Sequence, residues 1–331
     1  MRPAIRPARL AFSASILLIA AATLSLGHAQ QQAPASPAPA AQGPGYAIQR
    51  DVNLVVLHAS VVNARGQFVP GLQQENFHVF EDKVEQKLQV FRQEDVAVSL
   101  GLVVDNSGSM REKRDAVTTA ALTFVKTSNA ADEAFVVNFN DDFYLDTVND
   151  FTNDINELKD ALERIDSRGS TALYDAVIGS LDHLAKGHKD KKVLLVVTDG
   201  FDNASRRSLE DAVREAQKSD AVIYAVGLFG DDDLKQNRSG MRKARTALTE
   251  LTTATGGLAF FPDNPGDTEA LCTQIARDIR NQYTLAYNPS NTAQDGKFRA
   301  VQVDVVPPRG MGKLSARTRS GYYPKKTASG N

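Results

Sequence analysis

The segment from Leu100 to Met110 constrains the fold of this chain more than any other. It reads L-G-L-V-V-D-N-S-G-S-M, a short apolar run that ends at a carboxylate and is followed by two hydroxyls at alternate positions. An apolar run bounded by turn residues is typical of a buried strand, and open α/β sheets bind ligands beyond the carboxyl ends of such strands. The segment therefore predicts a site at a strand end, followed by a helix that begins near Met110.

Three oxygen-bearing side chains occupy every second position here: Asp105, Ser107 and Ser109. Hard cations such as Mg²⁺ take oxygen ligands and keep positions for water or another ligand, so the triplet is a candidate edge of a metal site. The same residue types are also typical of turns and helix N-caps. Taken alone, the triplet favours capping.

Two later segments favour the metal site. Lys192–Gly200 is a second apolar run that ends in a carboxylate, Asp199. Gly169–Ala176 places the hydroxyl of Thr171 at the start of a predicted helix. Five oxygen-bearing residues thus occur in order at predicted strand and helix ends.

With these residues, the chain resembles a von Willebrand factor A domain with a complete metal-ion-dependent adhesion site, over roughly residues 97 to 281. The resemblance implies one bound divalent ion, Mg²⁺ or else Mn²⁺ or Ca²⁺. It also implies a protein partner that presents an Asp or Glu side chain to that ion. A softer similarity to bacterial secreted proteins related to this family comes from the V-P-G-L segment Val69–Leu72. The implied metal ligands are Asp105, Ser107, Ser109, Thr171 and Asp199.

Strands alternate with helices from residue 96 to 281, which predicts an α/β domain with a doubly wound, mostly parallel sheet covered on both faces. Near its end lies the only cysteine of the chain, Cys272. It shares one face of a predicted helix with Ile275 and Ile279, the pattern of a small buried hydrophobic residue.

Two flanking segments, 47–95 and 282–323, are rich in alternating apolar residues. Each has too few strands to bury both of its faces. We expect them to form one small β-sandwich into which the α/β domain is inserted; the alternative is two separate β appendages. Within the first segment, residues 76–80 and 87–91 are predicted to pair as a hairpin.

The N-terminus has the pattern of an export signal. Arginines at positions 2, 6 and 9 precede an apolar stretch, Leu10–Leu26, and small residues precede a plausible cleavage point before Gln30. The alternative is a retained membrane anchor. We expect a signal peptide over 1–29, a Pro/Ala/Gln-rich linker over 30–46 and a disordered tail over 324–331. After cleavage no integral span is expected, and the protein would be periplasmic, on the outer surface or secreted.

Charge composition gives no indication of a nucleic-acid partner, since 38 Lys and Arg residues stand against 40 Asp and Glu. The oligomeric state is left open. The loops expected to surround the metal are Asn106, 200–203 and 229–240. In these loops Phe201 is either an exposed contact or a buried anchor.

Enzymatic functions are disfavoured. A serine hydrolase needs a histidine near Ser107 or Ser109, and there is no G-x-S-x-G motif. A phosphoryl-transfer enzyme with Asp105 as nucleophile normally adds a lysine and a further acid at the same sheet edge, and neither is evident in the sequence. A structural protein of the cell envelope with a stabilising metal remains an alternative. The five histidines are His28, His58, His78, His183 and His188.

Overall fold

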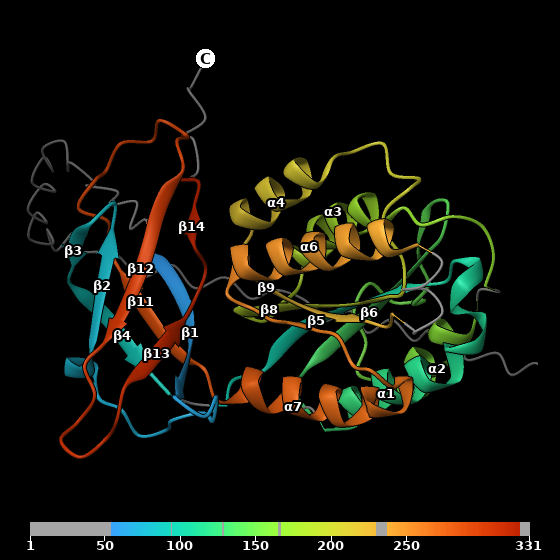
Figure 1. The fold of residues 1–331 in the computed structure, drawn as a ribbon. Coiled ribbons are helices and arrows are strands. Elements are labelled where there is room, and N and C mark those ends of the chain that lie inside the picture. The colour runs from blue at the N-terminus through green and yellow to red at the C-terminus, as the bar shows by residue number, and fades with distance from the viewer. Residues whose placement is uncertain (1–53, 94, 128, 165–166, 230–236, 325–331) are drawn as a thin grey trace, which may run out of the picture. The chain divides into compact units, whose positions relative to one another are not determined.

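The central feature of the fold is a six-stranded sheet between two layers of helices, accompanied by two four-stranded antiparallel sheets (Figure 1). The predicted fold class is confirmed. The predicted signal peptide and linker lie outside the described residues, as does the tail from residue 325. The computed structural model describes residues 54–93, 95–127, 129–164, 167–229 and 237–324.

The six-stranded sheet has the order β10-β9-β8-β5-β6-β7, and β7 alone runs antiparallel to its neighbour. Every residue of β5 and β9 is buried. Such continuous burial is typical of parallel strands covered on both faces. The strands are β5 (Val98–Asp105), β6 (Glu133–Phe139), β7 (Phe143–Leu145), β8 (Lys191–Thr198), β9 (Ala221–Gly227) and β10 (Ala259–Phe260).

Among the described residues, three helices pack on each face of this sheet (Figure 1). Side chains alternate along β5, so Leu102 packs with the first helix group and Val103 with the second. Cys272 is fully buried in the first of these cores, as predicted, and burial raises the pKa of its thiol to about 12. The first group is α1 (Arg114–Lys126), α2 (Ile155–Glu163) and α7 (Thr268–Arg280); the second is α3 (Leu173–Leu184), α4 (Leu209–Lys218) and α6 (Arg238–Thr255).

The two flanking segments share both remaining sheets, whose orders are β13-β1-β11-β4 and β14-β12-β2-β3. Each segment supplies two strands to each sheet, so neither half could bury its apolar face alone. The separate-appendage alternative is therefore wrong. The strands are β1 (Val55–Asn63), β2 (Phe77–Glu81), β3 (Val84–Gln86) and β4 (Leu88–Arg92) before the α/β domain, and β11 (Tyr283–Tyr287), β12 (Arg299–Val305), β13 (Leu314–Arg317) and β14 (Gly321–Tyr322) after it.

The predicted hairpin between residues 76–80 and 87–91 is wrong in its second strand. Asp82 and Lys83 both have positive φ, 48° and 70°, and this two-residue turn pairs β2 with the short β3 instead. The chain then crosses to the other sheet, where β4 pairs with β11. This crossing buries Leu88 in the core of the sandwich.

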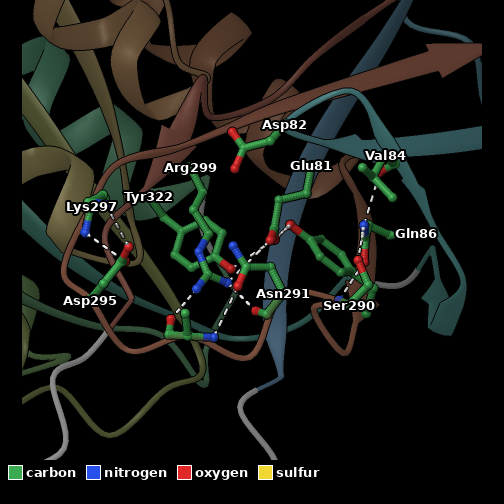
Figure 2. Close-up of polar contacts among 12 residues, drawn as sticks. Glu81, Asp82, Val84, Gln86, Ser290, Asn291, Asp295, Lys297, Arg299 and Tyr322 are labelled. Carbon is green, nitrogen blue, oxygen red and sulfur yellow. Dashed lines mark hydrogen bonds and ion pairs between the residues drawn. The ribbon is translucent and has the colours of Figure 1, made fainter.

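A buried ion pair links β12 and β2 within one sandwich sheet, and Tyr287 of the other sheet joins it through a hydrogen bond (Figure 2). Arg299 Nη1 lies 3.3 Å from Glu81 Oε1, and the two residues are 3% and 2% exposed. The hydroxyls of Tyr287 and Tyr322 each donate to Glu81 Oε2 at 2.8 Å. Burial raises the pKa of both tyrosines, which keeps these hydroxyls protonated as donors. The Arg299 guanidinium also donates to the carbonyls of Asn291 and Ala293, so its charge is well compensated.

Replacing Arg299 with Met should therefore destabilise the protein by about 3–5 kcal/mol, because the Glu81 carboxylate would remain buried without its counter-charge. Urea unfolding of the two proteins measures the difference. The matched control is Arg309→Met at an exposed position, expected to change stability by less than about 0.5 kcal/mol. Equal effects of the two substitutions would contradict the assigned role of the ion pair.

Candidate metal centre

The ends of β5 and β8 bring two carboxylates to one edge of the sheet. The strands pair in parallel up to Val104 and Val197, so Asp105 and Asp199 follow at the same edge. Both side chains are buried, and their residues are 1% and 2% exposed. Thr198 Oγ1 donates to Asp105 Oδ2 at 2.5 Å, which fixes one oxygen of that carboxylate.

The two serines join this pair through hydrogen bonds. The backbone N–H of Ser107 donates to Asp105 Oδ1 at 2.8 Å, and the two serine Oγ atoms lie 3.3 Å apart. Ser109 Oγ donates to Asp199 Oδ1 at 2.7 Å. Four of the five predicted residues are thus connected directly.

The helix predicted to begin near Met110 is different in the structure. A 3₁₀ segment, η2 (Gly108–Glu112), comes first, and α1 begins only at Arg114. The tighter turn buries Met110, which is 1% exposed, while Ser109 reaches Asp199. The α-helix therefore begins four residues later than the predicted start near Met110.

Thr171, the fifth predicted residue, lies near the carboxylates. An added Cβ on Gly200 would lie 3.3 Å from Thr171 Oγ1 and 4.0 Å from Asp105 Oδ2, so both oxygens border the same small space. Its loop is held on both sides, because Asn203 Oδ1 accepts from Thr171 N at 2.8 Å and Asn140 O accepts from Ala172 N at 2.7 Å. The structure brings all five predicted residues together.

The two carboxylates give the centre an excess of negative charge. Burial raises the pKa of Asp105 to about 6; the charge of Asp199 acts in the same direction, against the hydrogen bond from Thr198. A cation beside these oxygens would relieve both effects. Two carboxylates and three hydroxyls are hard oxygen donors, so the residues fit Mg²⁺, Mn²⁺ or Ca²⁺. Among the described residues, this centre included, no group of three or more His, Cys, Asp or Glu side chains is arranged to hold a metal.

Sequence reasoning missed a lysine at this edge of the sheet. Lys113 Nζ lies 2.7 Å from Asp199 Oδ2, although no suitable lysine was evident from the sequence. The residue lies four positions after Ser109 and directly before α1, so its position in the sequence gave a signal. Its contact with Asp199 depends on the 3₁₀ turn, which the sequence analysis did not predict.

Asn106 was expected on the rim of the centre, but it is buried and supports the loop that carries the two serines. The residue is 2% exposed, and its Nδ2 donates to Asn138 Oδ1 at 2.6 Å. Asn138 Nδ2 in turn donates to Asp146 Oδ2 at 2.7 Å and to the carbonyl of Ala161 at 2.8 Å. This buried amide pair fixes the loop that carries the two serines.

Two further side chains near the centre, Phe201 of the predicted rim and Asp175 of α3, anchor loops. Phe201 is half-buried and packs against the second helix group and Gly240, which supports its reading as a buried anchor. Asp175 accepts hydrogen bonds from the backbone N–H groups of Arg206 and Arg207, so it braces the loop after β8. Residues 230–236 of the expected rim lie outside the described residues.

The two histidines of the α/β domain lie away from the serines. His183 Nε2 contacts the carbonyl of Asp150, and its ring stacks on Phe151. His188 contacts Glu133 at the start of β6, the opposite end from Asp105. Neither of these two histidines is therefore in a position to act on Ser107 or Ser109.

Comparison with known proteins identifies a family for part of the α/β domain. Residues 100–201 match the family model of the von Willebrand factor type A domain. This part of the chain is therefore similar to a von Willebrand factor type A domain, and we call the α/β domain that contains it the A domain. The Asp105 triplet opens the matched part of this A domain, and Asp199 lies near its end. No curated protein matches the chain.

Solved structures similar to this chain include three bacterial proteins. BatB, a conserved hypothetical protein from Bacteroides thetaiotaomicron, is 17% identical with a TM-score of 0.44, covering 55% of this chain and 98% of that one. The A domain of the type V pili tip protein Mfa5 from Porphyromonas gingivalis is 14% identical at 0.44, covering 56% and 95%. A von Willebrand factor type A protein from Catenulispora acidiphila is 12% identical at 0.47, covering 85% and 76%.

The part of the chain that the structure describes contains no helix with the length and apolar character needed to cross a bilayer.

Replacing Asn138 with Leu should destabilise the A domain by about 3 kcal/mol, because the side chains of Asn106 and Asp146 and the carbonyl of Ala161 would lose buried partners. Chemical denaturation of the variant and the wild type provides the measurement. The exposed Asn153 offers a matched control, and Asn153→Leu should change stability by less than about 0.5 kcal/mol. A similarly small effect at Asn138 would contradict its supporting role.

Proposed function

We propose that the chain is an exported protein-binding module that depends on a divalent ion held by Asp105, Ser107, Ser109, Thr171 and Asp199. The proposed ligand is an acidic side chain of a partner protein, and no catalytic activity is assigned to the chain. The proposed ion is Mg²⁺, with Mn²⁺ or Ca²⁺ as alternatives. Export rests on the sequence pattern of residues 1–29.

One observation carries this proposal: five oxygen-bearing side chains from three segments lie together at the carboxyl edge of a parallel sheet. Only two of the five are carboxylates. The hydroxyls supply oxygen atoms without negative charge, so an ion bound here would keep part of its positive charge. Such an ion would attract a further carboxylate from outside.

The surface beside the centre offers apolar contacts for such a partner. The turn before β7 touches the Thr171 loop, because Asp141 Oδ1 accepts from Ser170 N at 2.8 Å. Phe143, Tyr144 and Leu145 of β7 are 38%, 44% and 41% exposed, and β7 is an edge strand. An exposed apolar edge next to a charged centre is typical of a recognition surface.

A hydrolytic function is less well supported, because neither histidine of the α/β domain, His183 or His188, lies close to Ser107 or Ser109 to act as a base. Lys113 does lie at the centre, but its ammonium is hydrogen-bonded to Asp199. A metal that serves stability alone remains the second candidate, and the two experiments below distinguish it from recognition.

Saturating Mg²⁺ or Mn²⁺ should raise the melting temperature of the wild-type protein, because a ligand that binds only the native state stabilises it. At one hundred times the dissociation constant the gain is about 2.7 kcal/mol. In Asp105→Ala the shift should vanish, whereas the exposed Asp150→Ala should retain it. Differential scanning calorimetry with chelator or metal provides the measurement. Identical wild-type melts in both conditions would argue against metal binding.

Recognition predicts metal-dependent capture of a specific partner. The wild-type protein, immobilised in Mg²⁺, should retain a protein from an envelope extract of the source cell, and chelator or Asp105→Ala should release it. Replacing the contacted Asp or Glu of the captured protein with Asn or Gln should then abolish binding. A metal with a purely structural role would raise the melting temperature and yet leave partner binding independent of that acidic residue.

A further inference from the structure

Both oxygens of Asp199 already have a donor within the chain. Ser109 Oγ donates to Oδ1 and Lys113 Nζ donates to Oδ2, each at 2.7 Å. The Asp199 side chain is 0% exposed and the Lys113 side chain is 14% exposed, so solvent screens this ion pair weakly. The lysine therefore supplies positive charge where a divalent ion would also supply it.

The backbone holds Lys113 firmly in this position. Its N–H donates to the carbonyl of Met110 at 2.9 Å, and its carbonyl accepts from the N–H of Val117 at 3.1 Å. The residue thus closes η2 and begins the hydrogen-bonding of α1. Arg111, the other cation of this turn, instead donates to the carbonyl of Ser167 at 3.3 Å. Of these two cations, Lys113 is the one directed at Asp199.

We propose that Lys113 is a built-in counter-ion that competes with the divalent ion for Asp199. This inference rests on the proposed metal site. Without metal, the ammonium compensates a buried carboxylate that would otherwise be unpaired. With metal, the same ammonium repels the ion and occupies an oxygen of one of its proposed ligands, so binding requires Lys113 to leave Asp199. Lys113 thereby sets the metal affinity of the centre.

Substitution by Met tests this competition, because Met keeps the apolar stem and removes the charge. Lys113→Met should melt at a lower temperature than the wild type in chelator and show a larger rise with Mn²⁺. Its affinity for Mn²⁺, measured from the free-ion signal in electron paramagnetic resonance, should be about tenfold tighter. Lys126→Met, at the exposed far end of the same helix, is the control and should match the wild type.

A lysine with a purely structural role would give a different pattern. Lys113→Met would then lose the same melting temperature with and without Mn²⁺, and its affinity would be unchanged or weaker; either result overturns the inference while leaving the metal site intact. If the wild type itself binds no Mn²⁺, the proposed metal site and this inference both fail.

A measurement on the wild type covers the case in which Lys113→Met does not fold. Acetylation by an N-hydroxysuccinimide ester reports the accessibility of each lysine amine and is quantified by mass spectrometry. Saturating Mg²⁺ should increase acetylation of Lys113 severalfold and leave Lys126 unchanged. Equal labelling of Lys113 with and without Mg²⁺ would show that the ion does not displace it and would overturn the proposal.

Discussion

The parallel pairing of β5 and β8 is the constraint on which the rest of the structure depends. Both strands are buried almost throughout, so their register is fixed by packing on both faces of the sheet. That register places Asp105 and Asp199 at one edge, where their like charges oppose each other. The hydrogen bonds from Thr198, Ser109 and Lys113 offset this repulsion. Packing of the apolar core thus holds the two carboxylates close together, and the hydrogen bonds from these polar residues reduce the cost of burying their charges.

The β-sandwich is stabilised in a comparable way, because Arg299 compensates a buried carboxylate between strands from distant parts of the sequence. The sandwich is also joined to the A domain by side-chain contacts. Gln282 Nε2 donates to the hydroxyl of Tyr224 at 3.1 Å, and Arg319 donates to the carbonyls of Gln217 and Ser219. These contacts come from a residue shortly after α7 and from one between β13 and β14, and they link the inserted domain to the module that surrounds it.

Sequence patterns predicted the elements whose signals are local. Apolar runs ending in Asp gave β5 and β8, and the alternation in the flanks gave a shared sandwich because each half lacked enough strands. The details that failed depend on tertiary structure. Asn106 looked like a loop residue, yet its amide pairs with Asn138, 32 positions away. The hairpin prediction missed the positive φ of Asp82 and Lys83, which residue types other than Gly and Asn rarely adopt. Lys113 was missed because its reach depends on a 3₁₀ turn.

The position of Lys113 also bears on the proposed recognition role of this centre. A nucleophilic hydroxyl needs a neighbouring base that can take its proton, but the only charged donor described at Asp199 is an ammonium whose proton is engaged with a carboxylate. Ser109 donates its hydroxyl proton to the other oxygen of the same carboxylate, so Asp199 is hydrogen-bonded to both the serine and the lysine. The hydrogen bonds to both carboxylates and from Ser109 favour a rigid, preorganised arrangement of these oxygens. Such an arrangement would lower the cost of binding the proposed cation.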